Sequence, residues 1–102
     1  GAAAASASAP ASQLPPADAV VTAEQIAFTE QNVKVPAGKP FTIAFDNRDT
    51  VQHNVAIPDA KFIGEVVTGP TATVYNVPAL PPGPHSFVCS IHPNMTGTLN
   101  AG

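Results

Sequence analysis

The stretch CSIHPNM at residues 89–95 places three kinds of metal-binding side chain within seven positions: Cys89, His92 and Met95. Cys89 and Met95 are the only cysteine and the only methionine in the chain. Because strand-like segments flank the stretch on both sides, it predicts a tight turn between two strands. We expect that turn to fold His92 and Met95 back towards the sulfur of Cys89.

A second histidine, His53 in the segment VQHNV at residues 51–55, supplies a further donor. Cu(I) favours thiolate and thioether sulfur, whereas imidazole nitrogen serves Cu(II) well. A one-electron carrier needs a site that suits both oxidation states, so that little moves on electron transfer. Two histidines, one cysteine and a weak axial methionine provide that compromise, and they predict one mononuclear copper site for electron transfer.

Two other interpretations of the same residues are weaker. Structural zinc sites also use cysteine and histidine, but methionine is a poor ligand for zinc. Alternatively, Cys89 is an inert buried cysteine beside a chance histidine and methionine. The grouping of the only Cys with the only Met in a β-rich chain argues against that interpretation.

The composition of the 102 residues limits the class of protein, since this length suits one domain with one core. Charged residues make up 11%, the net charge is −3 and no basic cluster occurs, which argues against nucleic acid as a partner. No apolar run approaches the roughly 20 residues of a membrane span. The start of the chain lacks the pattern of a signal peptide, as expected of a mature or trimmed chain. A single cysteine in an exported protein needs a reason, and metal ligation is one.

The chain divides into a tail and a domain. Residues 1–19 are rich in Ala, Ser and Pro and predict a disordered linker that would suit a membrane tether or a neighbouring domain. A cloning remnant with a frayed terminus is the alternative.

Residues 20–102 form the predicted domain. Twelve prolines and seven glycines favour short strands and turns, with no convincing helix. Seven or eight strands predict an all-β fold, an antiparallel β-sandwich, with candidates at residues 20–28, 32–35, 41–47, 53–57, 62–67, 71–77, 85–89 and 96–100.

The pattern Cys89-x-x-His92-x-x-Met95, with His53-Asn54 upstream, resembles the cupredoxin family of type 1 blue copper proteins. It is most similar to the amicyanin and plastocyanin branch, and the two-residue gap between His92 and Met95 is similar to that of amicyanin. The resemblance implies a Greek-key β-sandwich with copper at one end. It also implies a carrier, not an enzyme, that shuttles electrons between periplasmic or membrane-associated redox partners.

Residue by residue, the resemblance implies that His53, Cys89 and His92 are the strong equatorial copper ligands and that Met95 is the weak axial one. It also implies that Asn54 ties the two ligand loops together through Ser90, the residue after the cysteine. Hydrogen bonds of this kind, made by residues around the ligands, fix the ligands in place and tune the reduction potential of the metal.

The chain also departs from the family pattern. Val88 stands where plastocyanins place an exposed tyrosine, and the acidic residues form no run. Partners are therefore expected to dock near His92, where the uncharged neighbours Ile91 and Pro93 would form an apolar contact patch together with Pro58 and other loop residues. We expect a monomer in the periplasm or another extracytoplasmic compartment.

His85 has the strand parity of Cys89, so it is expected to point inward. The simpler interpretation is a hydrogen-bonded structural histidine; a second metal ligand or a proton-linked residue is the alternative.

Two other functions also stay open: a copper-binding domain of a larger oxidase or reductase, and a copper chaperone. A chaperone site is usually exposed and rich in Met or Cys, and this chain has one of each.

Overall fold

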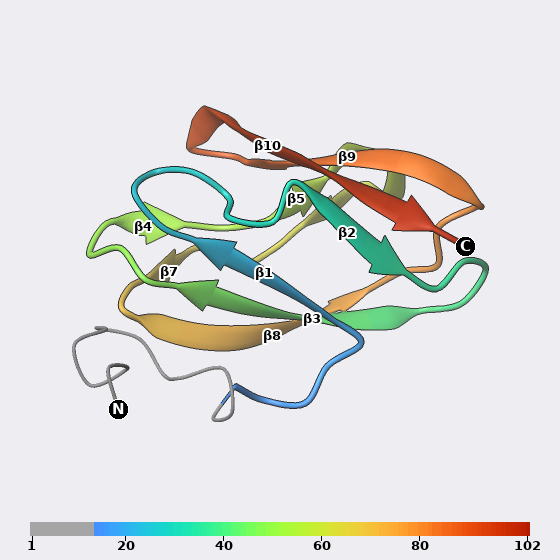
Figure 1. Cartoon of the computed structure of the whole chain (residues 1–102), viewed down its shortest axis with the longest axis horizontal. Helices are drawn as coiled ribbons and strands as arrows, with labels where there is room; N and C mark the ends of the chain where they lie inside the picture. Colours follow the sequence, from blue (N-terminus) through green and yellow to red (C-terminus); the bar gives the residue numbers. More distant parts are fainter. Residues whose placement is uncertain (1–13) are drawn as a thin grey trace.

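A computed structural model describes residues 14–102, and ten short strands with one 3₁₀ turn make up this part of the chain (Figure 1). No helix in the described residues is long and apolar enough to cross a membrane. In chain order the elements are β1 Ala19–Ala23, β2 Asn32–Val35, β3 Phe41–Asn47, β4 Gln52–His53, β5 Ala56–Ile57, η3 Pro58–Ala60, β6 Phe62–Ile63, β7 Val67–Thr68, β8 Thr71–Val77, β9 Gly83–Cys89 and β10 His92–Ala101.

The strands form two layers and a small ribbon. One layer has the order β1-β3-β8, the other has the order β2-β10-β9-β5-β6, and β4 pairs with β7. The first strands alternate between the layers, with β1 and β3 in one and β2 in the other. The predicted β-sandwich is confirmed, but its strands are not all antiparallel. β1 runs parallel to β3 and β2 runs parallel to β10, so both sheets are mixed.

Three predicted strands differ from the observed ones, which explains why the structure has ten strands and not eight. The segment 53–57 divides because Gln52–His53 pairs with β7, whereas Ala56–Ile57 pairs with β6 and β9. The segment 62–67 divides in the same way into β6 and β7. The first strand ends at Ala23. Soon after it, Gln25 and Ile26 take left-handed conformations, which do not occur in a regular strand.

The core lies between the layers. In β3 the alternating residues Phe41, Ile43 and Phe45 are buried, as the sequence pattern predicts. Phe87 of β9 is fully buried, and its ring lies 4.8 Å from that of Phe28. Burial of one such side chain stabilises the fold by about 1.5–3 kcal/mol. Gly97 of β10 faces the Phe87 ring so closely that a Cβ there would lie 2.3 Å from it, which leaves no room for a side chain.

Three loops meet at one end of the sandwich. Figure 1 shows β4, β7 and the turn between β9 and β10 at this end, opposite the C-terminus. His53 ends β4, Cys89 ends β9 and His92 begins β10. The predicted tail, residues 1–19, lies mostly outside the described residues. At its end Asp18 and Thr42 exchange hydrogen bonds of 2.9–3.2 Å, and Ala19 begins β1.

Candidate metal centre

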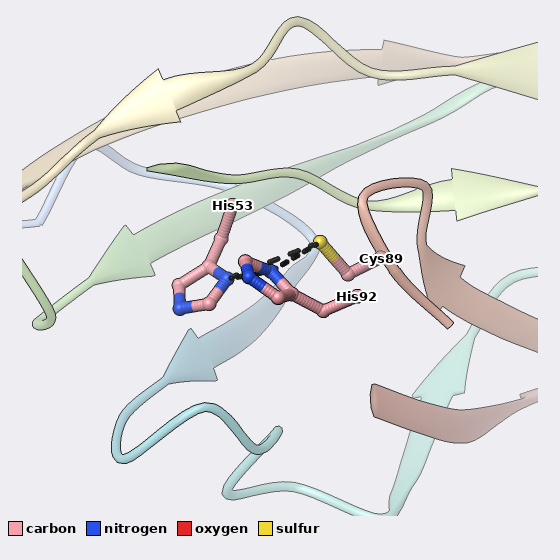
Figure 2. A group of neighbouring side chains, drawn as sticks. All are labelled: His53, Cys89 and His92. Carbon is pink, nitrogen blue, oxygen red and sulfur yellow. Dashed lines mark hydrogen bonds between the residues drawn. The ribbon is translucent and has the colours of Figure 1, made fainter. Parts of the chain in front are cut away.

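Three of the predicted ligands come together at this end of the fold. Figure 2 shows the side chains of His53, Cys89 and His92 pointing towards one another. Cys89 and His53 are fully buried, whereas His92 is half-buried. Within residues 14–102 they are the one group of His, Cys, Asp and Glu side chains with metal-binding geometry, and their ligand atoms all lie within 4.8 Å of one another.

The distances fit a single small cation. His53 Nδ1 lies 3.1 Å from His92 Nδ1, and Cys89 Sγ lies 3.9 Å and 3.7 Å from these two nitrogens. These separations let one ion contact all three atoms, because a bound metal would lie about 2.0 Å from imidazole nitrogen and about 2.3 Å from thiolate sulfur. Two imidazoles and one thiolate are the strong ligands of blue-copper sites. The donor set and its spacing therefore fit copper.

Met95 lies in the irregular part of β10. The register of β10 against β9 shifts between His92 and Thr96, and Met95 falls inside this interval. Its side chain is only 2% exposed. The bulge therefore lets the chain bury a long thioether between two exposed neighbours at this end of the sandwich.

Asp49 is a site residue that the sequence analysis missed. Its Oδ2 lies 2.7 Å from Nε2 of His53, so the imidazole donates that N–H to the carboxylate. In the neutral ring this leaves the lone pair on Nδ1, the nitrogen that faces Cys89 and His92. An aspartate four residues before a histidine is common in loops, so only the general rule that metal-binding histidines donate to a carboxylate would have suggested it.

Two backbone N–H groups hold Asp49 in turn. Gln25 N–H and Ile26 N–H donate to its carboxylate at 2.7 Å and 2.9 Å. Both residues have left-handed backbones, with φ of 56° and 53°, which is uncommon for any residue with a side chain and rare for isoleucine. Burial opposes ionisation of Asp49, but the N–H of Ile26, the His53 imidazole and the N–H of Gln25 outweigh it and hold the pKa of the carboxyl below its usual value.

Asn54 joins the two ligand loops. Its Oδ1 accepts a bond of 2.8 Å from the Ser90 N–H, and its Nδ2 donates to Ser90 Oγ at 3.0 Å. Nδ2 also donates to the carbonyl of Gly64 at 2.9 Å. Asn54 is fully buried, so these bonds cannot be exchanged for bonds to water without cost. The two bonds to Ser90 therefore connect Asn54, which follows His53, to Ser90, which follows Cys89.

His85 is not part of this group. It is buried in β9, where Nδ1 lies 2.6 Å from Asp59 Oδ2 and Nε2 lies 2.7 Å from the carbonyl of Pro81. Both nitrogens face acceptors, an arrangement that favours the doubly protonated ring beside Asp59. The Asp59 carboxylate first, and then the Pro81 carbonyl, raise the pKa of His85 above its usual value. These bonds agree with the structural interpretation of this histidine.

Comparisons with known proteins agree with this geometry. The model of the cupredoxin-like domain family matches residues 1–101. A reduced tryptophan-to-tyrosine mutant of amicyanin superposes with a TM-score of 0.69 at 19% identity, covering 89% of this chain and 88% of that one. Amicyanin from Paracoccus versutus (Thiobacillus versutus) gives 0.67 at 24% identity, covering 89% and 87%.

A dithionite-reduced auracyanin from the photosynthetic bacterium Roseiflexus castenholzii also has this fold. Its TM-score is 0.67 at 19% identity, over 81% of this chain and 94% of that one. No curated protein sequence matches the chain significantly. The TM-scores of 0.67–0.69 with these structures show a common fold, and the family model spans nearly the whole chain. The chain therefore belongs to the cupredoxin-like domain family.

Proposed function

We propose that this protein is a blue-copper electron carrier that holds one type 1 copper ion with His53, Cys89, His92 and Met95. One observation carries the proposal: two imidazole nitrogens and a buried thiol sulfur lie 3.1–3.9 Å from one another. Bound copper supplies the chemistry by cycling between Cu(I) and Cu(II), and no substrate is changed. Membership of the cupredoxin-like family and the fold shared with amicyanin and auracyanin support this function.

The chain itself supplies rigidity. Cys89, His53 and Met95 are buried, so water does not compete for the ligand positions. Asp49 orients His53, and Asn54 locks the His53 loop to the Cys89 loop. Because these bonds hold the ligands in place before and after electron transfer, little reorganisation accompanies the change of oxidation state.

His92 is the route by which we expect electrons to enter and leave. It is half-buried, whereas His53 and Cys89 are fully buried. Its neighbours Ile91, which is 45% exposed, and Pro93 are uncharged. Redox partners would dock on this apolar surface weakly, as electron-transfer proteins do through small interfaces. The same proposal places a monomer in the periplasm or another extracytoplasmic compartment.

Addition of Cu(II) to the metal-free protein tests the function. We expect one equivalent of copper to produce an intense visible band of thiolate-to-copper charge transfer. The Cys89→Ser variant should lose this band, because serine cannot supply a soft, covalent sulfur donor. A Cys89→Ser protein that stayed intensely blue would exclude this ligand assignment.

A further inference from the structure

The loop between β1 and β2, residues 24–31, lies at the same end of the sandwich as β4 (Figure 1). Hydrogen bonds close this loop on itself. The Glu24 N–H donates to the Ala27 carbonyl at 2.9 Å, and the Glu30 carboxylate accepts bonds of 2.6 Å and 2.9 Å from the N–H and the hydroxyl of Thr22. The loop therefore has a defined shape of its own.

Phe28 attaches the loop to the strand that ends at Cys89. Its side chain is only 3% exposed, and its ring lies 4.8 Å from that of Phe87, two residues before Cys89. The amide of Gln31 donates to the Phe28 carbonyl at 2.8 Å. The loop is thus packed against β9 through contacts that do not involve Asp49.

Two consecutive residues of this loop have strained backbones. Gln25 and Ile26 have φ of 56° and 53°, a conformation that is unfavourable for L-residues and most of all for a β-branched side chain. The Ile26 side chain is 54% exposed, so core packing does not offset this cost. Strain of this kind persists where the surrounding structure holds it, and it is concentrated at functional sites.

The N–H groups of these two residues converge on one carboxylate. Gln25 N–H donates to Oδ1 of Asp49 at 2.7 Å, and Ile26 N–H donates to Oδ2 at 2.9 Å. Oδ2 is also the oxygen that lies 2.7 Å from Nε2 of His53. Successive backbone N–H groups in such a turn form a concave site for an anion. The loop therefore fixes both oxygens of Asp49 and with them the direction of the bond to His53.

Asn47 fixes the backbone of Asp49. It is fully buried, its Oδ1 accepts the Asp49 N–H at 2.9 Å, and its Nδ2 donates to the carbonyls of Val51 and Val67 at 2.9 Å each. The side chain of Asp49 is 15% exposed, so a carboxylate released by the loop could turn towards water. The contacts with the loop are what keep it on His53.

We propose that Gln25 and Ile26 are positioning residues for the metal centre. Their backbone N–H groups hold the Asp49 carboxylate, which in turn holds the His53 ring with Nδ1 facing the site before the metal binds. The proposal deepens the function given above and rests on it, because it treats His53 as a copper ligand. It assigns the role to the two backbone N–H groups and not to the two side chains.

Replacing one backbone amide by an ester removes a single N–H and leaves every side chain in place. Chemical synthesis of the 102-residue chain can place an ester at Gln25 or at Ile26, with ¹⁵N-histidine at His53 alone. NMR of the metal-free protein then measures how fast the His53 Nε2–H exchanges with water. Each ester should speed this exchange roughly threefold to tenfold, the effect of one hydrogen bond. The affinity for copper, measured by competition with a chelator, should fall by a similar factor.

Three matched controls separate the two N–H groups from the rest of the loop. An ester at Glu24 removes an N–H that donates to Ala27 within the same loop and not to Asp49. Gln25→Gly and Ile26→Gly keep both N–H groups and tolerate positive φ. In all three proteins the exchange of the His53 N–H and the affinity for copper should stay close to those of the parent protein.

Several outcomes would overturn the proposal. Unchanged exchange at His53 in both esters would leave the loop without a positioning role. An equal change in the Glu24 ester would reduce the effect to a general loosening of the loop, and equal losses in the glycine variants would assign it to the side chains.

Asp49→Ala tests the same contact from the other side if an ester protein does not fold. It should speed amide exchange at Gln25 and Ile26, and unchanged exchange there would mean that the carboxylate does not engage the loop. The metal-free measurements keep the two proposals apart. A parent protein that binds no copper would refute the proposed function, while the exchange at His53 would still decide the role of the loop.

Discussion

Met95 is a buried side chain whose donor atom, as the proposed axial ligand, would set the balance between the two copper oxidation states. A thioether is a soft, weak ligand that favours Cu(I), whereas an amide oxygen favours Cu(II). Replacing the sulfur donor should therefore move the reduction potential in a direction that depends on the new side chain.

Met95→Gln should retain copper and lower the potential, because the amide oxygen stabilises Cu(II). Met95→Leu is the matched control: it keeps a large apolar side chain in a site that is 2% exposed but removes the donor, so the potential should rise. Protein-film voltammetry measures both values. Potentials equal to that of the parent protein in both variants would mean that Met95 is not an axial ligand.

Asp49 acts on the metal centre through His53. Its carboxylate holds the ring with Nδ1 facing the site, so Asp49→Asn should weaken copper binding by about 10–100-fold. Loss of a negative charge near the metal should also raise the potential, because Cu(II) carries more charge than Cu(I). Competition with a chelator measures the affinity.

The control for Asp49→Asn is Glu24→Gln, which removes the same charge from the loop next to Gln25. Glu24 is exposed and has no hydrogen bond to His53. Its affinity for copper should stay close to that of the parent protein. If both variants weakened binding equally, the effect of Asp49 would be general electrostatics and the His53 hydrogen bond would have no special part.

Among the secondary-structure elements, η3 is attached to β9 by a titratable contact. The His85–Asp59 pair joins them, with Nδ1 and Oδ2 only 2.6 Å apart. The folded-state pKa of His85 is raised above its unfolded value of about 6.5. Its contribution to stability is therefore fully present below about pH 6.5 and is lost as the pH rises through the folded-state pKa.

Asp59→Asn should therefore lower the melting temperature of the metal-free protein more at pH 5.5 than at pH 8.5, two values that bracket the usual histidine pKa of about 6.5. Thermal unfolding followed by circular dichroism at both pH values measures the difference. The control is Glu65→Gln, an exposed charge with no contact to His85, whose effect should not depend on pH in this range. A destabilisation by Asp59→Asn that is constant with pH would mean that His85 is neutral in the folded protein.

Copper should stabilise the whole sandwich, because its ligands come from segments far apart in the chain. A ligand that binds only the folded state, at a free concentration 100 times its Kd, adds about 2.7 kcal/mol. For a domain of this size that raises the melting temperature by roughly 10–20 °C.

Differential scanning calorimetry of the copper-loaded and metal-free proteins tests this stabilisation. The Cys89→Ser protein should show little of the increase, because it lacks the thiolate. If the loaded and metal-free proteins melted together at saturating copper, the ion would not be an integral part of the folded site.

The sequence by itself determined the β class and the buried face of β3, and it singled out three candidate ligands in one turn. These features depend on short spacings: alternation in Phe41, Ile43 and Phe45 indicates a strand face, and Cys89, His92 and Met95 lie within one turn. His53 was found by its chemistry, because a His₂Cys site with an axial methionine needs a second imidazole.

The tertiary structure alone decided the parallel pairing of β1 with β3 and of β2 with β10, and the bond from Asp49 to His53. Strand direction depends on how distant segments cross between layers, and a local pattern carries no information about it. The support of Asp49 comes from Gln25 and Ile26, which are 24 and 23 residues away and whose left-handed backbones no propensity predicts. Contacts of this kind form only when the whole sandwich closes, because packing brings these groups together and their own sequences do not.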